Sequence, residues 1–136
     1  MKRRSRFYPR VQVDTAEVPA VGQAGGVLLT VTVAAAVLDV ALSAALAPWR
    51  KPLAIHDPGK VVLDLALTLA LGGDRPADIA LLRAEPGVYG MVASDPTVSR
   101  TIDALAADSP AALKAIKHGA RGGAGAGVGT GRGTRR

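Results

Sequence analysis

Apolar residues recur at helical spacing through the middle of the chain, and Pro, Gly and short polar residues divide them into segments. The segment 56–73 begins with Asp57 and Pro58, which suit an N-cap and a first helical position, and it stops at Gly72-Gly73. Its odd positions also alternate as in a strand. Leu and Ala favour helix, however, and the end residues agree, so the sequence predicts a buried helix with one narrow polar face. That face holds Lys60, Asp64 and Thr68.

Segment 74–87 predicts a short helix that ends before Pro86, because a residue that precedes proline is disfavoured in helical geometry. Ile79 and Leu82 are expected to face inward.

Two further helices repeat the same start. One begins with Asp95 as N-cap and Pro96 at the first position. The other begins with Ser109 as N-cap and is expected to end at Gly119. The basic residues near that end, Lys114, Lys117 and His118, would then face the negative end of the helix dipole.

The segment 27–47 is the most apolar part of the chain, with Asp39 as its one charge and a basic flank at Arg50-Lys51. Its length and apolarity suit a transmembrane helix. Against this, Asp39 would lie near the middle of the bilayer, which costs roughly 2.5–3.5 kcal/mol on insertion scales. A soluble helix, or two helices with a break near Val37–Asp39, explains the pattern as well, and we favour it over a membrane anchor.

Composition limits the kind of core that the chain can build. Aromatic residues make up 3% of the 136 residues, so the core depends on Ala, Leu, Val and Ile. The chain has no cysteine, which excludes disulfides and thiolate metal sites and fits a cytoplasmic location. Together the segments predict an all-α fold: about five helices over residues 27–118, between a disordered basic arm, 1–26, and a disordered Gly/Arg-rich tail, 119–136.

The positive charge lies mainly in these two ends. Residues 1–10 carry +5 and residues 121–136 carry +4, whereas the residues between them carry −3. Basic arms of this kind attract nucleic-acid phosphates. The residues that carry the charge of the first arm, and that we take as candidate DNA contacts, are Lys2, Arg3, Arg4, Arg6 and Arg10.

The stretch SDPTVSRTIDALA, 94–106, is typical of the second helix of a helix-turn-helix. Thr97, Ser99 and Arg100 are the residue types that contact bases and phosphates near the start of such a helix. The spacing disagrees, because residues 84–93 separate this helix from the preceding one where a compact motif has three or four residues. An amphipathic surface helix with a good cap remains the alternative.

No metal-ligand or catalytic cluster is expected. His56-Asp57 could belong to a metal-dependent phosphohydrolase, but the only other histidine is His118, so a capping role for Asp57 is favoured. Neither a small-molecule substrate nor a cofactor is indicated.

Residues 49–106 resemble the N-terminal part of bacterial insertion-sequence transposases of the group called transposase DDE domain, group 1. The most specific pieces are HDPGKVVLDLAL, GGDRPADIALLR and SDPTVSRTIDAL, in this order. The resemblance implies DNA as the partner. For full-length relatives it implies an RNase H-like core with an Asp, Asp, Glu triad and two Mg²⁺ ions that cut and rejoin DNA.

No residue of this chain can be matched to that triad. We therefore expect a transposase remnant, truncated before the catalytic core, that binds DNA weakly and mainly through its basic ends and that is inactive as an enzyme.

Overall fold

The computed structural model describes residues 7–10 and 23–129, and within these residues every regular element is helical. The predicted all-α class is therefore confirmed, with more helices than expected. The α-helices are α1 (Gln23–Ala35), α2 (Leu38–Ala45), α3 (Pro58–Ala70), α4 (Ala80–Arg83), α5 (Pro86–Tyr89), α6 (Asp95–Ala106) and α7 (Ser109–Gly129). Two 3₁₀ helices, η1 (Ala47–Trp49) and η2 (Pro76–Ile79), complete the described part.

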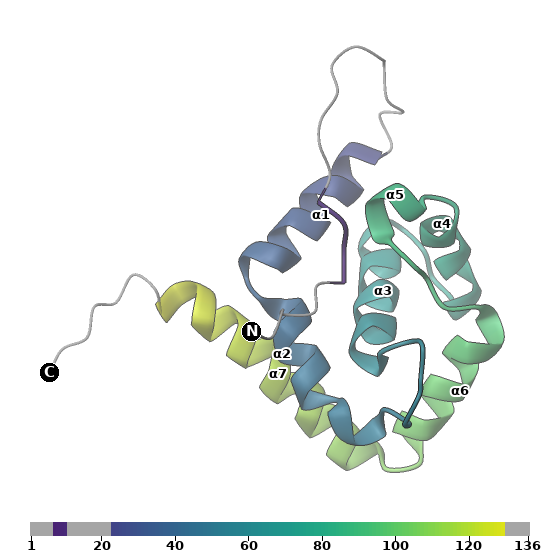
Figure 1. The fold of residues 1–136 in the computed structure, drawn as a ribbon, viewed down its shortest axis with the longest axis vertical. Helices are drawn as coiled ribbons and strands as arrows, with labels where there is room; N and C mark the ends of the chain where they lie inside the picture. Colours follow the sequence, from purple (N-terminus) through teal and green to yellow (C-terminus); the bar gives the residue numbers. More distant parts are fainter. Residues whose placement is uncertain (1–6, 11–22, 130–136) are drawn as a thin grey trace, which may run out of the picture.

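The helices surround α3, as Figure 1 shows. On one side of α3 lie α1 and α2, and α7 packs along the outer side of α2. On the other side lie α4, α5 and α6, and a tight turn joins α6 to α7. Helix α2 is therefore packed between α3 and α7.

The apolar segment 27–47 is broken, at the point that the sequence suggested. Val37 adopts a left-handed conformation with φ 58°, which is unusual for a β-branched residue, and it separates α1 from α2. Asp39, in the first turn of α2, is 1% exposed and accepts a hydrogen bond from the Val40 amide at 2.9 Å. No single described helix is long and apolar enough to cross a membrane; Gly25–Ala35 and Leu38–Ala45 meet that test only as a pair bent by 67°.

Helix α3 has the predicted start. The Asp57 side chain accepts a hydrogen bond from the Gly59 amide at 2.7 Å, and Pro58 occupies the first turn. The predicted polar face points into the protein, since Asp64 and Thr68 are each 1% exposed. Segment 74–87 ends its helix at Arg83, before Pro86 as predicted, and Ile79 and Leu82 are fully buried.

The N-terminal arm is the first correction. The sequence prediction assigned residues 1–26 to a disordered arm, but Phe7 is buried in a cluster with Val33, Leu42 and Leu63. Tyr8 packs against the two apolar clusters of the core, and α1 already begins at Gln23. The physical reason is the large area that an aromatic side chain buries, in a chain with few other aromatic residues. Residues 1–6 and 11–22 lie outside the described residues.

Tyr8 also satisfies the buried polar face of α3. Its hydroxyl donates a hydrogen bond to Asp64 Oδ1 at 2.6 Å, and Lys60 Nζ pairs with Asp64 Oδ2 at 2.6 Å. The Lys60 ammonium also lies 5.0 Å from the centre of the Tyr8 ring. Burial raises the pKa of the Asp64 carboxyl above its ordinary value, although Lys60 opposes the shift.

Two helix boundaries also differ from the prediction. Helix α6 begins one residue early, with Ser94 as its N-cap and Asp95 inside the first turn. Helix α7 does not stop at Gly119 but continues to Gly129. Gly119 is buried against α2, and a Cβ there would lie 2.9 Å from Leu42 Cδ2, so this glycine permits close helix packing and does not end the helix. Residues 130–136 of the predicted tail lie outside the described residues.

Candidate functional site

An open groove of about 330 Å³ lies between the loop that follows η1 and one face of α6. The loop supplies two cations, Arg50 and Lys51, together with His56, and α6 supplies Arg100. The other lining residues are Trp49, Leu53, Ala54, Ile55, Pro58, Thr97, Thr101 and Ala104. No carboxylate lines the groove, so its lining is basic and apolar.

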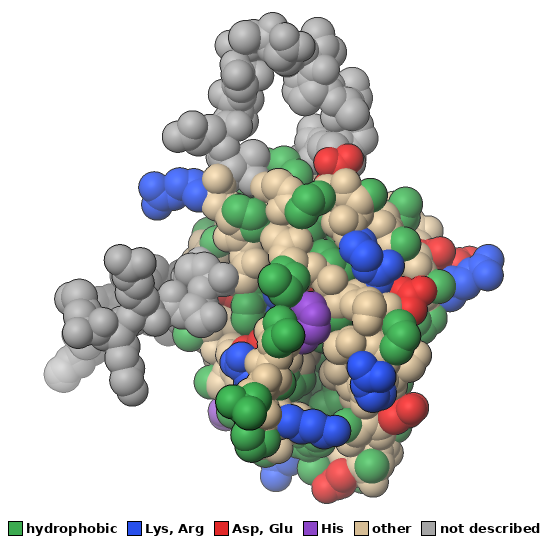
Figure 2. Space-filling view, turned by 45° about the vertical axis from the view of Figure 1, so that its right-hand side comes forward, with side chains coloured by type: hydrophobic (Ala, Val, Ile, Leu, Met, Phe, Trp, Pro, Cys, Tyr) green, Lys and Arg blue, Asp and Glu red, His purple; other side chains and the backbone are tan. Residues whose placement is uncertain are grey.

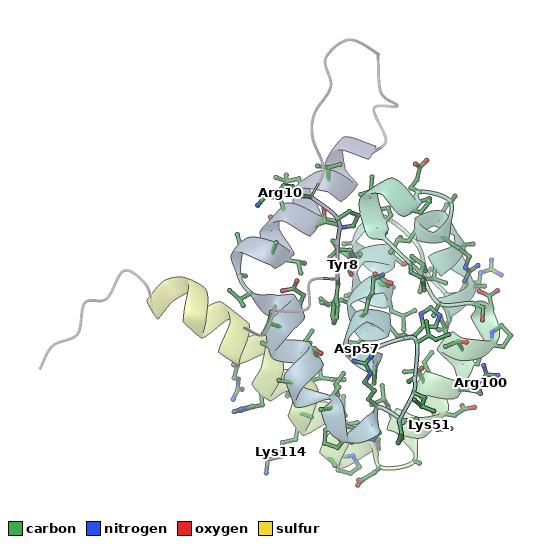
Figure 3. All side chains as sticks on the ribbon, in the orientation of Figure 1. Tyr8, Arg10, Lys51, Asp57, Arg100 and Lys114 are labelled. Carbon is green, nitrogen blue, oxygen red and sulfur yellow. The ribbon has the colours of Figure 1, made fainter. Side chains whose placement is uncertain are left out.

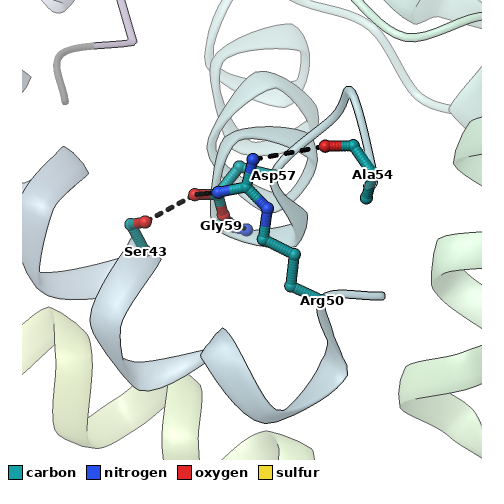
Figure 4. A network of polar contacts seen from close by, with 5 residues as sticks. All are labelled: Ser43, Arg50, Ala54, Asp57 and Gly59. Atoms are coloured by element: carbon teal, nitrogen blue, oxygen red, sulfur yellow. Dashed lines mark hydrogen bonds and ion pairs between the residues drawn. The ribbon is translucent and has the colours of Figure 1, made fainter. Parts of the chain in front are cut away.

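The loop side of the groove is fixed by the Asp57 carboxylate. Besides capping α3, this carboxylate accepts hydrogen bonds from the Ser43 hydroxyl of α2 and, at 3.3 Å, from Arg50 Nη1 (Figure 4). Arg50 Nη2 then donates to the Ala54 carbonyl at 3.3 Å. One acidic residue thus ties α2, the loop and α3 together, which holds the loop against the start of α3.

The α6 side of the groove is fixed by Arg83 of α4. Its Nη2 donates to the Ala93 carbonyl at 2.7 Å and to Asp95 Oδ1 at 2.9 Å. These contacts anchor the start of α6. The Arg83 guanidinium therefore stabilises the fold. Arg100, which is exposed, is the arginine of α6 that lines the groove.

The structure brings together two of the three residues that the sequence singled out on this helix. Thr97 and Arg100 both line the groove, and Arg100 Nη2 donates to Thr97 Oγ1 at 3.2 Å. Ser99 is exposed but does not line the groove, because helical geometry turns it to another side of α6. The surroundings are not those of a compact helix-turn-helix, since α5 lies between α4 and α6.

Figure 3 shows Lys51 and Arg100 on the same side of the molecule, and Arg10 far from both, near α1. In the space-filling view of Figure 2, basic, acidic and hydrophobic side chains are interspersed over the face that the figure presents. Arg10 is exposed, and Lys2, Arg3, Arg4 and Arg6 lie outside the described residues. Arg10 is therefore the one candidate contact of the N-terminal arm among the described residues, and it does not share a surface with Arg100 of α6.

His56 adds a titratable group to the groove. Burial lowers the pKa of its imidazole below the ordinary value of 6.5, and the nearby Lys60 lowers it further. The imidazole is therefore mainly neutral at pH 7. A bound anion would favour its protonated form.

The sequence prediction missed the contribution of the loop. Arg50 and Lys51 were interpreted only as the flank of an apolar segment, yet together with Trp49 they form one wall of the groove. Leu53 in this loop is fully exposed and adopts a left-handed φ of 65°, which is uncommon for a residue other than glycine. The basic pair beside an exposed apolar residue was visible in the sequence, but its position opposite α6 depends on the tertiary contacts of Asp57.

Three acidic residues of the described part hold the fold together. Asp57 caps α3, Asp64 pairs with Lys60, and Asp95 pairs with Arg83. Within residues 7–10 and 23–129, no three His, Cys, Asp or Glu side chains are grouped so that they could hold a metal ion. These described residues therefore do not fit the two-Mg²⁺ site that the resemblance implies for full-length relatives.

Comparison with known protein families gives a match. The family model described as "Transposase DDE domain group 1" matches residues 3–121, which is most of the chain and includes every element that lines the groove. No curated protein and no solved structure matches the chain.

Proposed function

The chain belongs to the transposase DDE domain group 1 family, and from this premise we propose that it binds DNA without cutting it. The groove between the loop and α6 carries the proposal. Arg50, Lys51 and Arg100 line it, and no carboxylate does. Such a surface suits a phosphate backbone, and an arginine can also hold a guanine edge with two hydrogen bonds.

The two parts of the chain have different tasks in this proposal. The basic ends, 1–10 and 121–136, hold nine of the seventeen Lys and Arg residues and provide most of the affinity, which is weak and independent of sequence. Arg100 adds a preference at one base pair, and Thr97 and Lys51 contact the backbone beside it. The ligand is therefore duplex DNA of the mobile element, and the groove sets the position of the chain on it.

The test compares two labelled duplexes, one with the terminal sequence of the element and one with that sequence scrambled. Loss of one guanine contact costs about 1–3 kcal/mol, so Arg100→Ala should reduce the preference for the terminal sequence by about 5- to 150-fold or to none. Its affinity for the scrambled duplex should change little. Arg75→Ala is the matched control, because Arg75 is exposed, lies outside the groove and pairs with the exposed Asp74.

If Arg100→Ala shows the same preference for the terminal sequence as the control Arg75→Ala, Arg100 does not recognise the DNA sequence, and this part of the proposal is wrong. The binding of wild-type protein should be measured by fluorescence anisotropy at low salt, where weak electrostatic binding is strongest.

A second prediction concerns the absence of cleavage. Phosphoryl transfer by two metal ions requires clustered carboxylates, and Asp57, Asp64 and Asp95 are all committed to hydrogen bonds or ion pairs within the fold. The purified chain, incubated with the terminal duplex and Mg²⁺ or Mn²⁺, should leave both strands intact on a denaturing gel. Specific nicking above a buffer control, which Asp64→Asn abolishes, would show that a catalytic site exists.

A further inference from the structure

Helix α7 carries a stripe of basic residues that the folding of the chain does not explain. Lys117 and His118 lie three and four residues after Lys114, and Arg121 lies four and three residues after them, so all four share one face of the helix. All four are exposed, and together with Ala45 of α2 they line a shallow hollow beside that helix. We refer to these four residues as the α7 stripe.

The stripe has no neutralising partner in the described part of the chain. None of the four side chains forms an ion pair or hydrogen bond there, and Ser109–Gly129 contains neither Asp nor Glu. Like charges three and four residues apart destabilise a helix. The helix dipole does not compensate for this, because α7 continues to Gly129 and the stripe lies well before its C-terminal turn.

We infer that the α7 stripe is a second DNA-binding surface, which holds the phosphate backbone of a duplex independently of base sequence. The helix rises 1.5 Å per residue, so Lys114 and Arg121 are about 10 Å apart along its axis. One strand of B-DNA presents a phosphate about every 3.4 Å along the helix axis. The stripe therefore spans about three phosphates, and Ala111 and Ala115 beside it are small enough to permit close approach.

The apolar side of α7 argues against an anionic membrane as the ligand. A helix that lies on a bilayer inserts bulky apolar residues between the lipids. The apolar face of α7 packs against the rest of the protein instead. Ala112 and Gly119 are buried, and Ile116 packs against the core cluster that contains Leu42. Leu113 is the one large apolar side chain of α7 that is strongly exposed in the described part.

The stripe and the groove lie on different helices. Figure 3 shows Lys114 on the α7 side of the molecule and Arg100 on the α6 side. This inference rests on the proposed function, because it takes DNA as the ligand, but the two surfaces have separate tests. The groove is tested by a preference between sequences, and the stripe by binding to DNA of random sequence.

The experiment uses the intact chain and a short fluorescently labelled duplex of random sequence at several salt concentrations. The triple variant Lys114→Gln, Lys117→Gln, Arg121→Gln should make the slope of log K against log salt less negative by about 2.7, and should weaken binding about tenfold or more at low salt. The matched control, Lys114→Arg, Lys117→Arg, Arg121→Lys, keeps every charge and should keep the slope. Circular dichroism of both variants shows whether the helices are retained.

An unchanged slope in the folded triple variant would overturn the inference, and so would a variant that loses binding to vesicles of phosphatidylserine and phosphatidylcholine but not to DNA. If the triple variant keeps the wild-type slope while Arg100→Ala loses sequence preference, the α7 stripe does not bind DNA and the proposed function of the groove stands. If the triple variant changes the slope while Arg100→Ala keeps the sequence preference, the stripe binds DNA and the groove does not recognise its sequence.

Discussion

At the residue scale, Asp57 shows how one side chain can serve both the fold and the candidate site. Its two carboxylate oxygens receive hydrogen bonds from the Gly59 amide, the Ser43 hydroxyl and Arg50. The interaction with Gly59 was predicted from the Asp-Pro pair, because a cap depends only on residues next to it in the chain. The interactions with Ser43 and Arg50 were not, because they depend on how α2 packs against α3.

His56 leads to a prediction about pH. Burial and Lys60 hold its pKa below 6.5, so the imidazole is neutral in the free protein at pH 7. A phosphate in the groove stabilises the protonated form and raises the pKa of His56 in the complex. Formation of the complex therefore takes up a proton. DNA affinity should rise as the pH falls from the pKa of His56 in the complex toward its lower pKa in the free protein, by at most about tenfold per pH unit.

The measurement is DNA affinity at constant salt between mildly acidic and neutral pH, for wild type and His56→Gln. The variant should lose part of the pH dependence. The same measurement on His118→Gln separates the contribution of the second histidine, which lies on the α7 stripe. Identical pH profiles for wild type and His56→Gln would place the DNA away from the groove.

At the element scale, the close crossings of helices depend on glycine. A Cβ on Gly59 would lie 2.8 Å from the Ser43 amide nitrogen and 2.9 Å from the Leu42 carbonyl carbon, and backbone cannot move aside as a side chain can. We predict that Gly59→Ala lowers the free energy of unfolding by about 1–3 kcal/mol, the usual cost of overpacking. Gly87 of α5 is the matched control, since a Cβ there meets nothing within 4 Å.

Urea denaturation of the two variants checks this prediction. Gly87→Ala should leave stability unchanged or raise it by about 0.4–1 kcal/mol, because alanine restricts the unfolded chain. Equal stabilities for Gly59→Ala and Gly87→Ala would mean that α2 and α3 do not pack as closely as described.

The elements that could be predicted from the sequence are those set by neighbouring residues, and the errors arise where a contact joins distant parts of the chain. Helix α3 and the break before Pro86 follow from local residue types, and the structure confirms them. For segment 27–47 the sequence left one helix or two as alternatives, and the structure has two, separated at Val37. The end of α7 was wrong because Gly119 has two opposite meanings, a helix stop in isolation and a packing site against Leu42 in the fold. The docking of Phe7 was missed because it joins residues far apart in the chain, and no local pattern records such a contact.

At the scale of the whole molecule, net charge hides how the cations are arranged. The residues between the basic ends carry a net charge of −3, which indicated a body that repels phosphate. In the structure, however, Asp57, Asp64 and Asp95 are paired with Arg50, Lys60 and Arg83. Lys51 and Arg100 of the groove, and the basic residues of the α7 stripe, form no ion pair within the described residues. The candidate site could therefore be predicted only in part: Arg100 and Thr97 from a local motif, the loop and the stripe only from the fold.

DNA binding itself is the central claim, and its salt dependence is the most direct test. The intact chain should be titrated into duplex DNA of random sequence at a series of salt concentrations. Engagement of all nine charges of the basic ends would give a slope of log K against log salt of about −8, and engagement of half of them about −4. A slope between these values is the predicted result. No measurable binding at low salt, or binding whose strength does not depend on salt, would contradict the account.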